Sequence, residues 1–151
     1  MNIQYLTKEE VFRIKDVLED NKSTLCLRDK AIGLLALYLG LRSCDIAGLA
    51  LADIDWRKDL LHIRQQKTGV ALELPMKATI GNAIYDYLIV ERPATECQKV
   101  FVTQTNPATK LQGSSMYHVA KKIMEAANIR GQRSGTGKGF TCSGIIWRYP
   151  C

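Results

Sequence analysis

Residues 39–46 read LGLRSCDI and residues 66–69 read QKTG, and these two short stretches are the most informative part of the chain. In the first stretch, Arg42 directly follows an apolar helical pattern and shortly precedes the carboxylate of Asp45. An arginine held in this way offers a rigid, two-pronged donor to a phosphate group. In the second stretch, Lys67 stands at the tip of a predicted hairpin and can bring a mobile ammonium to the same phosphate.

The region around the first stretch is predicted to be helical. Residues 27–39 are apolar nearly all round, which is typical of a helix buried in the core. Upstream, residues 7–10 have a capping-box pattern, which predicts a helix that runs to about Asp20. Downstream, Ser43 is predicted to cap a short third helix over residues 44–51.

The second stretch lies between two segments of alternating polarity. Residues 60–64 and 70–74 alternate between apolar and polar side chains, as the strands of a half-buried hairpin do. Residues 66–69 provide the turn between them. Pro75 is expected to end the second strand, because proline has no N–H group to donate to a ladder.

Three further elements are predicted after the hairpin. Residues 77–91 have the spacing of an amphipathic helix, residues 100–102 predict a short strand, and Ser114 or Ser115 is expected to cap a last helix. No internal repeat or domain linker interrupts this order. The sequence therefore predicts a single α+β domain that is mostly helical and contains a small β-hairpin or sheet.

The composition favours a globular protein with a polyanionic partner. The chain has 46% hydrophobic and 24% charged residues, which is ordinary for a globular chain. Lys and Arg outnumber Asp and Glu by 21 to 15, and the formal net charge of +6 favours a partner such as nucleic acid. The pattern of a signal peptide is missing and no apolar run could cross a bilayer, so we expect a cytoplasmic protein with no membrane partner.

The remaining chemically active residues predict neither a metal nor a nucleotide. The 5 cysteines show no C-x-x-C pair, and His62 and His118 are far apart without an evident partner, unlike the ligands of a zinc site. We expect both histidines to be structural or surface residues. Residues 135–139 read GTGKG, but a phosphate-binding loop needs another glycine before them and Ser or Thr after the lysine.

The two stretches resemble the first half of the active site of the tyrosine recombinase (phage integrase) family. The family's first box has Gly-Leu-Arg, an acidic residue three positions later and apolar residues leading to Asp-Ile-Asp. Residues 40–42, Asp45 and residues 53–55 fall in these places, although the acidic residue is more often Glu. Lys67 corresponds to the family's β-hairpin lysine, and the resemblance covers about residues 6–140.

The resemblance implies a chemistry for these residues. Arg42 would bind the non-bridging oxygens of the scissile phosphate, with Asp45 in support, and Lys67 would protonate the leaving 5′ oxygen. Thr68, beside the lysine, is expected to contact DNA as well. In the family a tyrosine on a late helix attacks phosphorus to give a 3′-phosphotyrosyl bond, so the reaction needs no metal, no ATP and no other cofactor. Duplex DNA and further recombinase protomers are the implied partners.

The family's second box, a His, two residues, an Arg and usually another His, should follow Phe140, but residues 141–151 read TCSGIIWRYPC. One allowed coding of residues 140–148 is TTC ACC TGT TCC GGC ATC ATT TGG CGT. Regrouped from the last base of the first codon it becomes CAC CTG TTC CGG CAT CAT TTG GCG, which encodes His-Leu-Phe-Arg-His-His-Leu-Ala. A lost base therefore predicts a partial integrase catalytic domain at residues 1–140 and an out-of-frame tail at 141–151. A divergent natural C-terminus is the other interpretation.

No tyrosine is assigned as the nucleophile, because five precede the second box and the sixth lies in the tail. We therefore expect a truncated, catalytically incomplete, DNA-binding fragment of a site-specific tyrosine recombinase from a mobile element. The alternatives are a non-enzymatic DNA-binding or interaction protein and an inactive relic of a mobile-element gene, so whether the chain is an enzyme is left open. The six tyrosines are Tyr5, Tyr38, Tyr85, Tyr87, Tyr117 and Tyr149.

Overall fold

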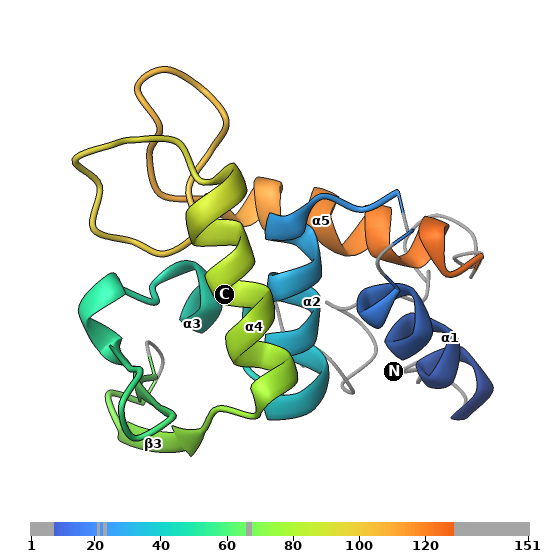
Figure 1. The fold of residues 1–151 in the computed structure, drawn as a ribbon, viewed down its shortest axis with the longest axis horizontal. Helices are drawn as coiled ribbons and strands as arrows, with labels where there is room; N and C mark the ends of the chain where they lie inside the picture. Colours follow the sequence, from blue (N-terminus) through green and yellow to red (C-terminus); the bar gives the residue numbers. More distant parts are fainter. Residues whose placement is uncertain (1–7, 21, 23, 66–67, 129–151) are drawn as a thin grey trace.

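The structure is a computed structural model that describes residues 8–20, 22, 24–65 and 68–128 (Figure 1). The described part is mostly helical and includes a small antiparallel sheet, as the sequence predicted. In chain order the elements are α1 (Lys8–Glu19), α2 (Leu27–Leu39), α3 (Ser43–Ala47), the 3₁₀ turn η1 (Leu51–Asp53), β1 (Ile54–Asp55), β2 (Leu60–Arg64), β3 (Ala71–Pro75), α4 (Ala78–Asp86), the π-helical turn η2 (Tyr87–Glu91) and α5 (Gly113–Ala126).

Helix α2 lies at the centre of the domain. All residues from Ala31 to Ala36 are buried, which confirms that the all-round apolar pattern marks a core helix. Helices α1, α4 and α5 and the turn η2 pack against it (Figure 1). Because the middle of α2 is enclosed on every side, its two ends are where the chain can present polar groups.

Gly33 allows α1 and α5 to approach α2 closely. A Cβ atom at this position would lie 2.5 Å from Cδ2 of Leu18 on α1 and 2.9 Å from Cδ1 of Ile123 on α5. Both of these side chains are buried in the core, with exposed fractions of 2% and 0%. The glycine therefore sets how tightly the three helices pack, since protein interiors leave little free volume for an extra methyl group.

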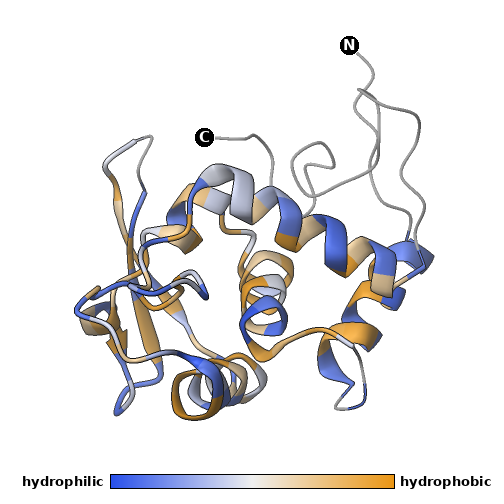
Figure 2. Cartoon of the chain, turned by 90° about the horizontal axis from the view of Figure 1, so that it is seen from above, coloured by the Kyte–Doolittle hydropathy of each residue, from blue (hydrophilic) through white to orange (hydrophobic). Residues whose placement is uncertain are grey.

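The sheet has the strand order β1–β2–β3, with both pairs antiparallel. In β2, Leu61 and Ile63 are buried while His62 and Arg64 are exposed, which is the alternation expected of a strand with one face on the core. Strand β3 ends at Pro75, which lies opposite Leu60. Figure 2 shows how hydrophobic and hydrophilic residues are distributed along the hairpin and the helices.

Helix α4 passes directly into the π-helical turn η2, whose last residue caps α2. Glu91 accepts hydrogen bonds from the backbone N–H of Leu27 (2.9 Å) and Arg28 (3.3 Å). The N-cap residue, Cys26, makes no side-chain capping bond. A residue from a distant part of the chain therefore satisfies N–H groups that the helix leaves without intrahelical partners.

Two predicted helix boundaries and one predicted strand are wrong. Helix α3 is shorter than predicted and starts at Ser43, with Arg42 rather than Ser43 as its N-cap. Residues 100–102 form no strand and take part only in an isolated bridge between Val102 and Lys110. Helix α5 starts at Gly113, since the backbone carbonyl of Gln112 already accepts a hydrogen bond from the N–H of Met116 (3.1 Å). In each case backbone partners, which the side-chain pattern does not encode, set the boundary.

The packing at Gly33 predicts that Gly33→Ala lowers the free energy of unfolding by about 1–3 kcal/mol, because the added methyl group overpacks the junction of α1, α2 and α5. Gly81→Ala in α4 is the matched control. There the nearest atom to a new Cβ is Met76 Cε at 3.6 Å, an ordinary contact. Alanine should then stabilise the helix by about 0.5–1 kcal/mol. Chemical denaturation of both variants tests this, and equal stabilisation at the two positions would contradict it.

Candidate nucleic-acid interface

Arg42 lies at the junction between α2 and α3. Helix α2 ends at Gly40, which has φ of +63° in the left-handed region that glycine adopts most readily. Leu41 is then buried, and Arg42 follows in an extended conformation as the N-cap of α3. The carbonyl of Arg42 accepts a hydrogen bond from the N–H of Ile46 (3.0 Å). These contacts fix the backbone of Arg42, while its side chain is only half-buried.

Asp45 lies in the first turn of α3, immediately after Arg42. Its exposed fraction is 4%, and the neighbouring Ser43 is also buried. Helix α3 packs against α2 and α5, so the carboxylate lies on a well-supported element. This placement is compatible with the predicted supporting role of Asp45, and that role stays a prediction.

The hairpin tip is closed by hydrogen bonds on both sides of residues 66–67. Gln65 donates its backbone N–H to the carbonyl of Val70 (2.9 Å) and accepts from the N–H of Gly69 (2.8 Å). Thr68 is exposed, and its hydroxyl donates to Oε1 of Gln65 (2.9 Å) and accepts from the N–H of Val70 (3.2 Å). The described contacts of the Thr68 hydroxyl therefore hold the turn together, and a DNA contact from Thr68 stays a prediction.

Lys67 lies outside the described residues, so the predicted proximity of Arg42 and Lys67 also stays a prediction. The elements that flank them are described. In Figure 1, α3 and the hairpin lie on the same side of the pair formed by α2 and α4.

Tyr38, close to the end of α2, joins three helical segments. Its hydroxyl donates to Oε1 of Glu19 on α1 (2.9 Å). The ammonium of Lys77, the N-cap of α4, is 5.1 Å from the centre of the ring, and that of Lys15 on α1 is 5.8 Å away. These are cation–π distances, so two positive charges are held near the end of α2 that leads to Arg42. Sequence reasoning missed this cluster, because no local pattern pairs Tyr38 with residues on other helices.

The described tyrosines are held in different ways. Burial and the hydrogen bond to Glu19 raise the pKa of Tyr38 to about 12. Burial also raises the pKa of Tyr87, whose hydroxyl oxygen accepts a hydrogen bond from the N–H of Val102 (3.3 Å). Tyr85 and Tyr117 are exposed. Tyr5 and Tyr149 lie outside the described residues, and the prediction that none of the six is the nucleophile stays untested.

The two histidines have partners that the sequence did not predict. Nδ1 of His62 is 3.8 Å from Oε1 of Glu73, its neighbour across the hairpin. The ring of His118 packs edge-on against Tyr117. Within the described residues, no group of three His, Cys, Asp or Glu side chains is placed to hold a metal ion. Of the helices in that same part of the chain, none has the length and apolar content needed to cross a membrane.

The fold matches that of tyrosine recombinase catalytic domains. The catalytic core of lambda integrase aligns with a TM-score of 0.62 and 13% identity, covering 95% of this chain and 82% of that one. XerH recombinase, in a pre-cleavage complex with its difH substrate, aligns with a TM-score of 0.68 and 18% identity over 95% of this chain and 40% of that one. A lambda integrase dimer bound to a COC′ core site aligns with a TM-score of 0.58 and 17% identity, covering 89% of this chain and 44% of that one.

The amino-acid sequence leads to the same group of proteins. Residues 4–137 match the phage integrase family. A protein of Sinorhizobium fredii named "Putative integrase/recombinase y4gC" is 32% identical over 130 residues, which are 85% of this chain and 67% of that protein. The chain therefore belongs to the phage integrase family, and the resemblance inferred from the two short stretches is confirmed. It spans about two thirds of y4gC and less than half of XerH.

The raised pKa of Tyr38 predicts a pH dependence of stability. The folded pKa of about 12 exceeds the usual value of 10, so the unfolded state releases its proton first as the pH rises. The stability contributed by the neutral phenol is complete below about pH 10 and is lost between about pH 10 and pH 12. Tyr38→Phe should therefore lose stability less steeply over this range than the unmodified protein. Denaturation at several pH values measures the slope, and Tyr117→Phe, at an exposed tyrosine, should leave it unchanged.

Proposed function

We propose that this chain is the DNA-binding part of a tyrosine recombinase catalytic domain, in which Arg42 binds a phosphate of duplex DNA. The observation that carries the proposal is the position of Arg42 in a fold shared with recombinase catalytic domains. Its backbone is fixed between the left-handed end of α2 and the start of α3, while its side chain keeps partial access to solvent. A fixed guanidinium loses little freedom when it binds a phosphate through paired hydrogen bonds.

In this proposal Arg42 neutralises the non-bridging oxygens of the phosphate, where negative charge grows as phosphorus is attacked. Lys67 is the second cation and protonates the leaving 5′ oxygen, and Thr68 contacts the same strand. Asp45 holds Arg42 in place. The buried position of Asp45 one turn along α3 and the ordered ends of the hairpin tip support these assignments.

Duplex DNA and further recombinase protomers are the proposed partners. The net charge of +6 supports a polyanionic ligand. Among the structures of similar fold, XerH is bound to its difH substrate and lambda integrase forms a dimer on a COC′ core site. The proposed reaction class is site-specific DNA integration or recombination through a 3′-phosphotyrosyl intermediate. It requires no nucleotide and no metal, and a cytoplasmic location stays a prediction.

We also propose that residues 1–140 form a partial catalytic domain and that residues 141–151 are translated out of frame. The genetic code permits a coding of residues 140–148 that, regrouped by one base, encodes the family's second box in its expected place, and this supports the proposal. The chain as written then lacks a second-box His and Arg and a nucleophilic tyrosine, so it is catalytically incomplete. Sequencing the locus through the Phe140 codon tests the proposal, and an uninterrupted natural frame that encodes residues 141–151 would overturn it.

The role of Arg42 predicts a specific change in DNA binding. The purified chain should bind duplex DNA weakly, with an affinity that falls steeply as the salt concentration rises. Arg42→Ala should weaken binding about three- to tenfold and reduce the salt slope by about 1, because one phosphate contact is lost. Arg13→Ala is the control, since it removes the same charge from an exposed ion pair with Glu9 on α1. Equal losses in both variants, measured by fluorescence anisotropy, would contradict a specific role for Arg42.

The proposed incompleteness predicts that this chain forms no covalent DNA adduct, because in this proposal none of its tyrosines serves as the nucleophile that attacks phosphorus. Nicked suicide substrates with varied recombination-site sequences, followed by denaturing electrophoresis, test this. A frame-restored, extended version should form the adduct on one of the same substrates. A covalent band from the present chain that maps to any of its tyrosines would show that it is complete. DNA binding by the frame-restored version without any adduct would favour a non-enzymatic DNA-binding protein.

A further inference from the structure

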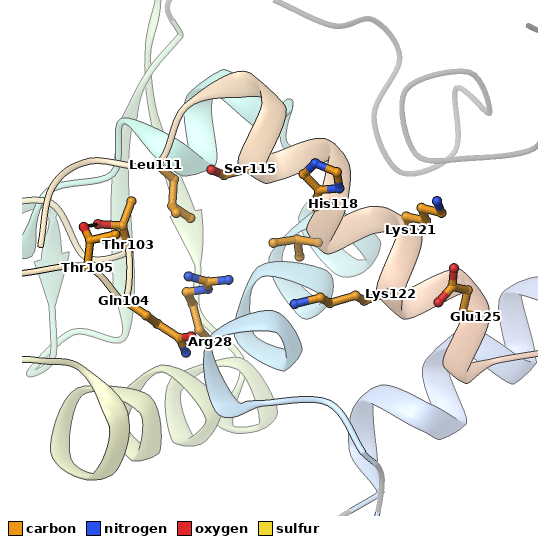
Figure 3. Close-up of a pocket in the computed structure, with 11 residues that line it drawn as sticks. Arg28, Thr103, Gln104, Thr105, Leu111, Ser115, His118, Lys121, Lys122 and Glu125 are labelled. Atoms are coloured by element: carbon orange, nitrogen blue, oxygen red, sulfur yellow. Dashed lines mark hydrogen bonds between the residues drawn. The ribbon is translucent and has the colours of Figure 1, made fainter.

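A polar hollow lies between α5 and the loop that contains residues 103–105 (Figure 3). Its volume is about 540 Å³, and a second hollow of about 450 Å³ adjoins it. Arg28, Gln104, Lys122 and Glu125 line both hollows, so they form the shared centre of one larger depression. Figure 3 shows Arg28, Gln104 and Lys122 pointing toward one another from three separate segments of the chain.

The guanidinium of Arg28 is held by hydrogen bonds through two of its three nitrogens. Its side chain is only 11% exposed. Nε donates to Oδ1 of the buried Asp29 (3.3 Å), and Nη1 donates to the carbonyl of Val102 (3.3 Å). Within the described residues, Nη2 makes no protein hydrogen bond. A guanidinium held on two sides with its third nitrogen free is a pre-organised donor for an anion.

Lys122 and Gln104 complete the donor set. Both side chains are exposed at the mouth of the hollow. In the described part of the chain, Lys122 has no carboxylate within ion-pair distance and Gln104 makes no side-chain hydrogen bond. Glu125 lies beyond Lys122 in Figure 3, away from the guanidinium. The space between Arg28 and Lys122 is therefore flanked by two cations and an amide, while Glu125 and Asp29, the latter already bound by Arg28, line other parts of the depression.

We infer that this depression binds a phosphate-type anion, with Arg28 and Lys122 on opposite sides of it and the Gln104 amide as a third donor. A tetrahedral anion presents oxygens in several directions and can accept from all three at once. The hydroxyls of Thr103 and Thr105 are not part of this donor set, because they hydrogen-bond to each other (2.7 Å). The anion has two chemical sources, free phosphate and a backbone phosphate of nucleic acid.

The depression is separate from the proposed phosphate site at Arg42. Arg28 is near the start of α2 and Arg42 follows its end, and 13 helical residues span about 20 Å. One phosphate group cannot bridge that distance. The inference therefore does not depend on the proposed function of Arg42, and each can fail without the other.

The test is an NMR titration of the full chain with inorganic phosphate at constant ionic strength, with chloride as the balancing salt. Backbone amide signals of residues 103–105 and 118–122 should shift with phosphate and not with chloride. Lys122→Gln should weaken the apparent affinity at least about fivefold, and Gln104→Glu should abolish the shifts by placing a like charge at the mouth. Lys58→Gln removes one positive charge from an exposed turn and should leave the affinity unchanged. Equal weakening by Lys122→Gln and Lys58→Gln would overturn the inference.

A second arm of the titration distinguishes the two sources of phosphate. A short duplex DNA is titrated into the Arg42→Ala variant while the same amide signals are followed. If the duplex shifts them and Lys122→Gln removes those shifts, the bound group is a backbone phosphate. If only inorganic phosphate shifts them, the site takes a free anion. If neither ligand shifts them, the inference is wrong.

Discussion

At Gly33 the helices α1, α2 and α5 meet closely, because the tips of Leu18 and Ile123 occupy the space that a side chain at this position would need. With this junction fixed, α2 is enclosed along its middle by α1, α4 and α5. A helix enclosed in this way has little freedom to tilt or slide, since close-packed interiors resist such shifts. The backbone positions at the two ends of α2 are therefore fixed as well. Arg28 and Arg42 are thus positioned by one buried element although they face different parts of the surface.

The two arginines, each the centre of a proposed anion site, differ in their surroundings. Arg28 is almost fully buried and is already engaged by the carboxylate of Asp29, which compensates for the loss of hydration of its charge. Arg42 is only half-buried. The described contacts of this residue fix its backbone and do not include an ion pair of its guanidinium. Lys15 and Lys77 on the ring of Tyr38 add positive charge near that end of α2. Charged side chains therefore gather at both ends of a helix whose middle is apolar.

Much of the fold follows from local sequence patterns. The all-round apolar pattern of α2 and the alternation of β2 each depend on near neighbours, and the structure confirms the core helix and the half-buried strand. The limits of α3 and the π-helical turn η2 could not be predicted in this way, because backbone hydrogen bonds with no side-chain signature decide them. The same holds for the candidate sites. Arg42 and Asp45 were found because one short motif contains both.

The depression near the start of α2 is different, because Arg28, Gln104 and Lys122 come from three segments without any shared period or spacing. The packing of α5 against α2 brings Arg28 and Lys122 together, and the loop that carries Gln104 lines the same hollow. The clustering of Lys15, Tyr38 and Lys77 likewise depends on how α1 and α4 meet α2. Sequence reasoning finds candidate residues when one local segment holds them, and it misses them when tertiary contacts bring them together.

The π-helical turn η2 has a consequence for how this domain tolerates changes in length. Glu91 reaches the first N–H groups of α2 only because the wider turn ends where it does. Each residue of a regular helix turns the chain by about 100°, so one residue gained or lost between Tyr87 and Glu91 would point the carboxylate away from α2. We therefore expect insertions and deletions in this turn to disturb the cap on α2 more than substitutions on its exposed surface do. The number of residues in this turn therefore decides whether Glu91, at the end of the α4 segment, can cap the start of the central helix.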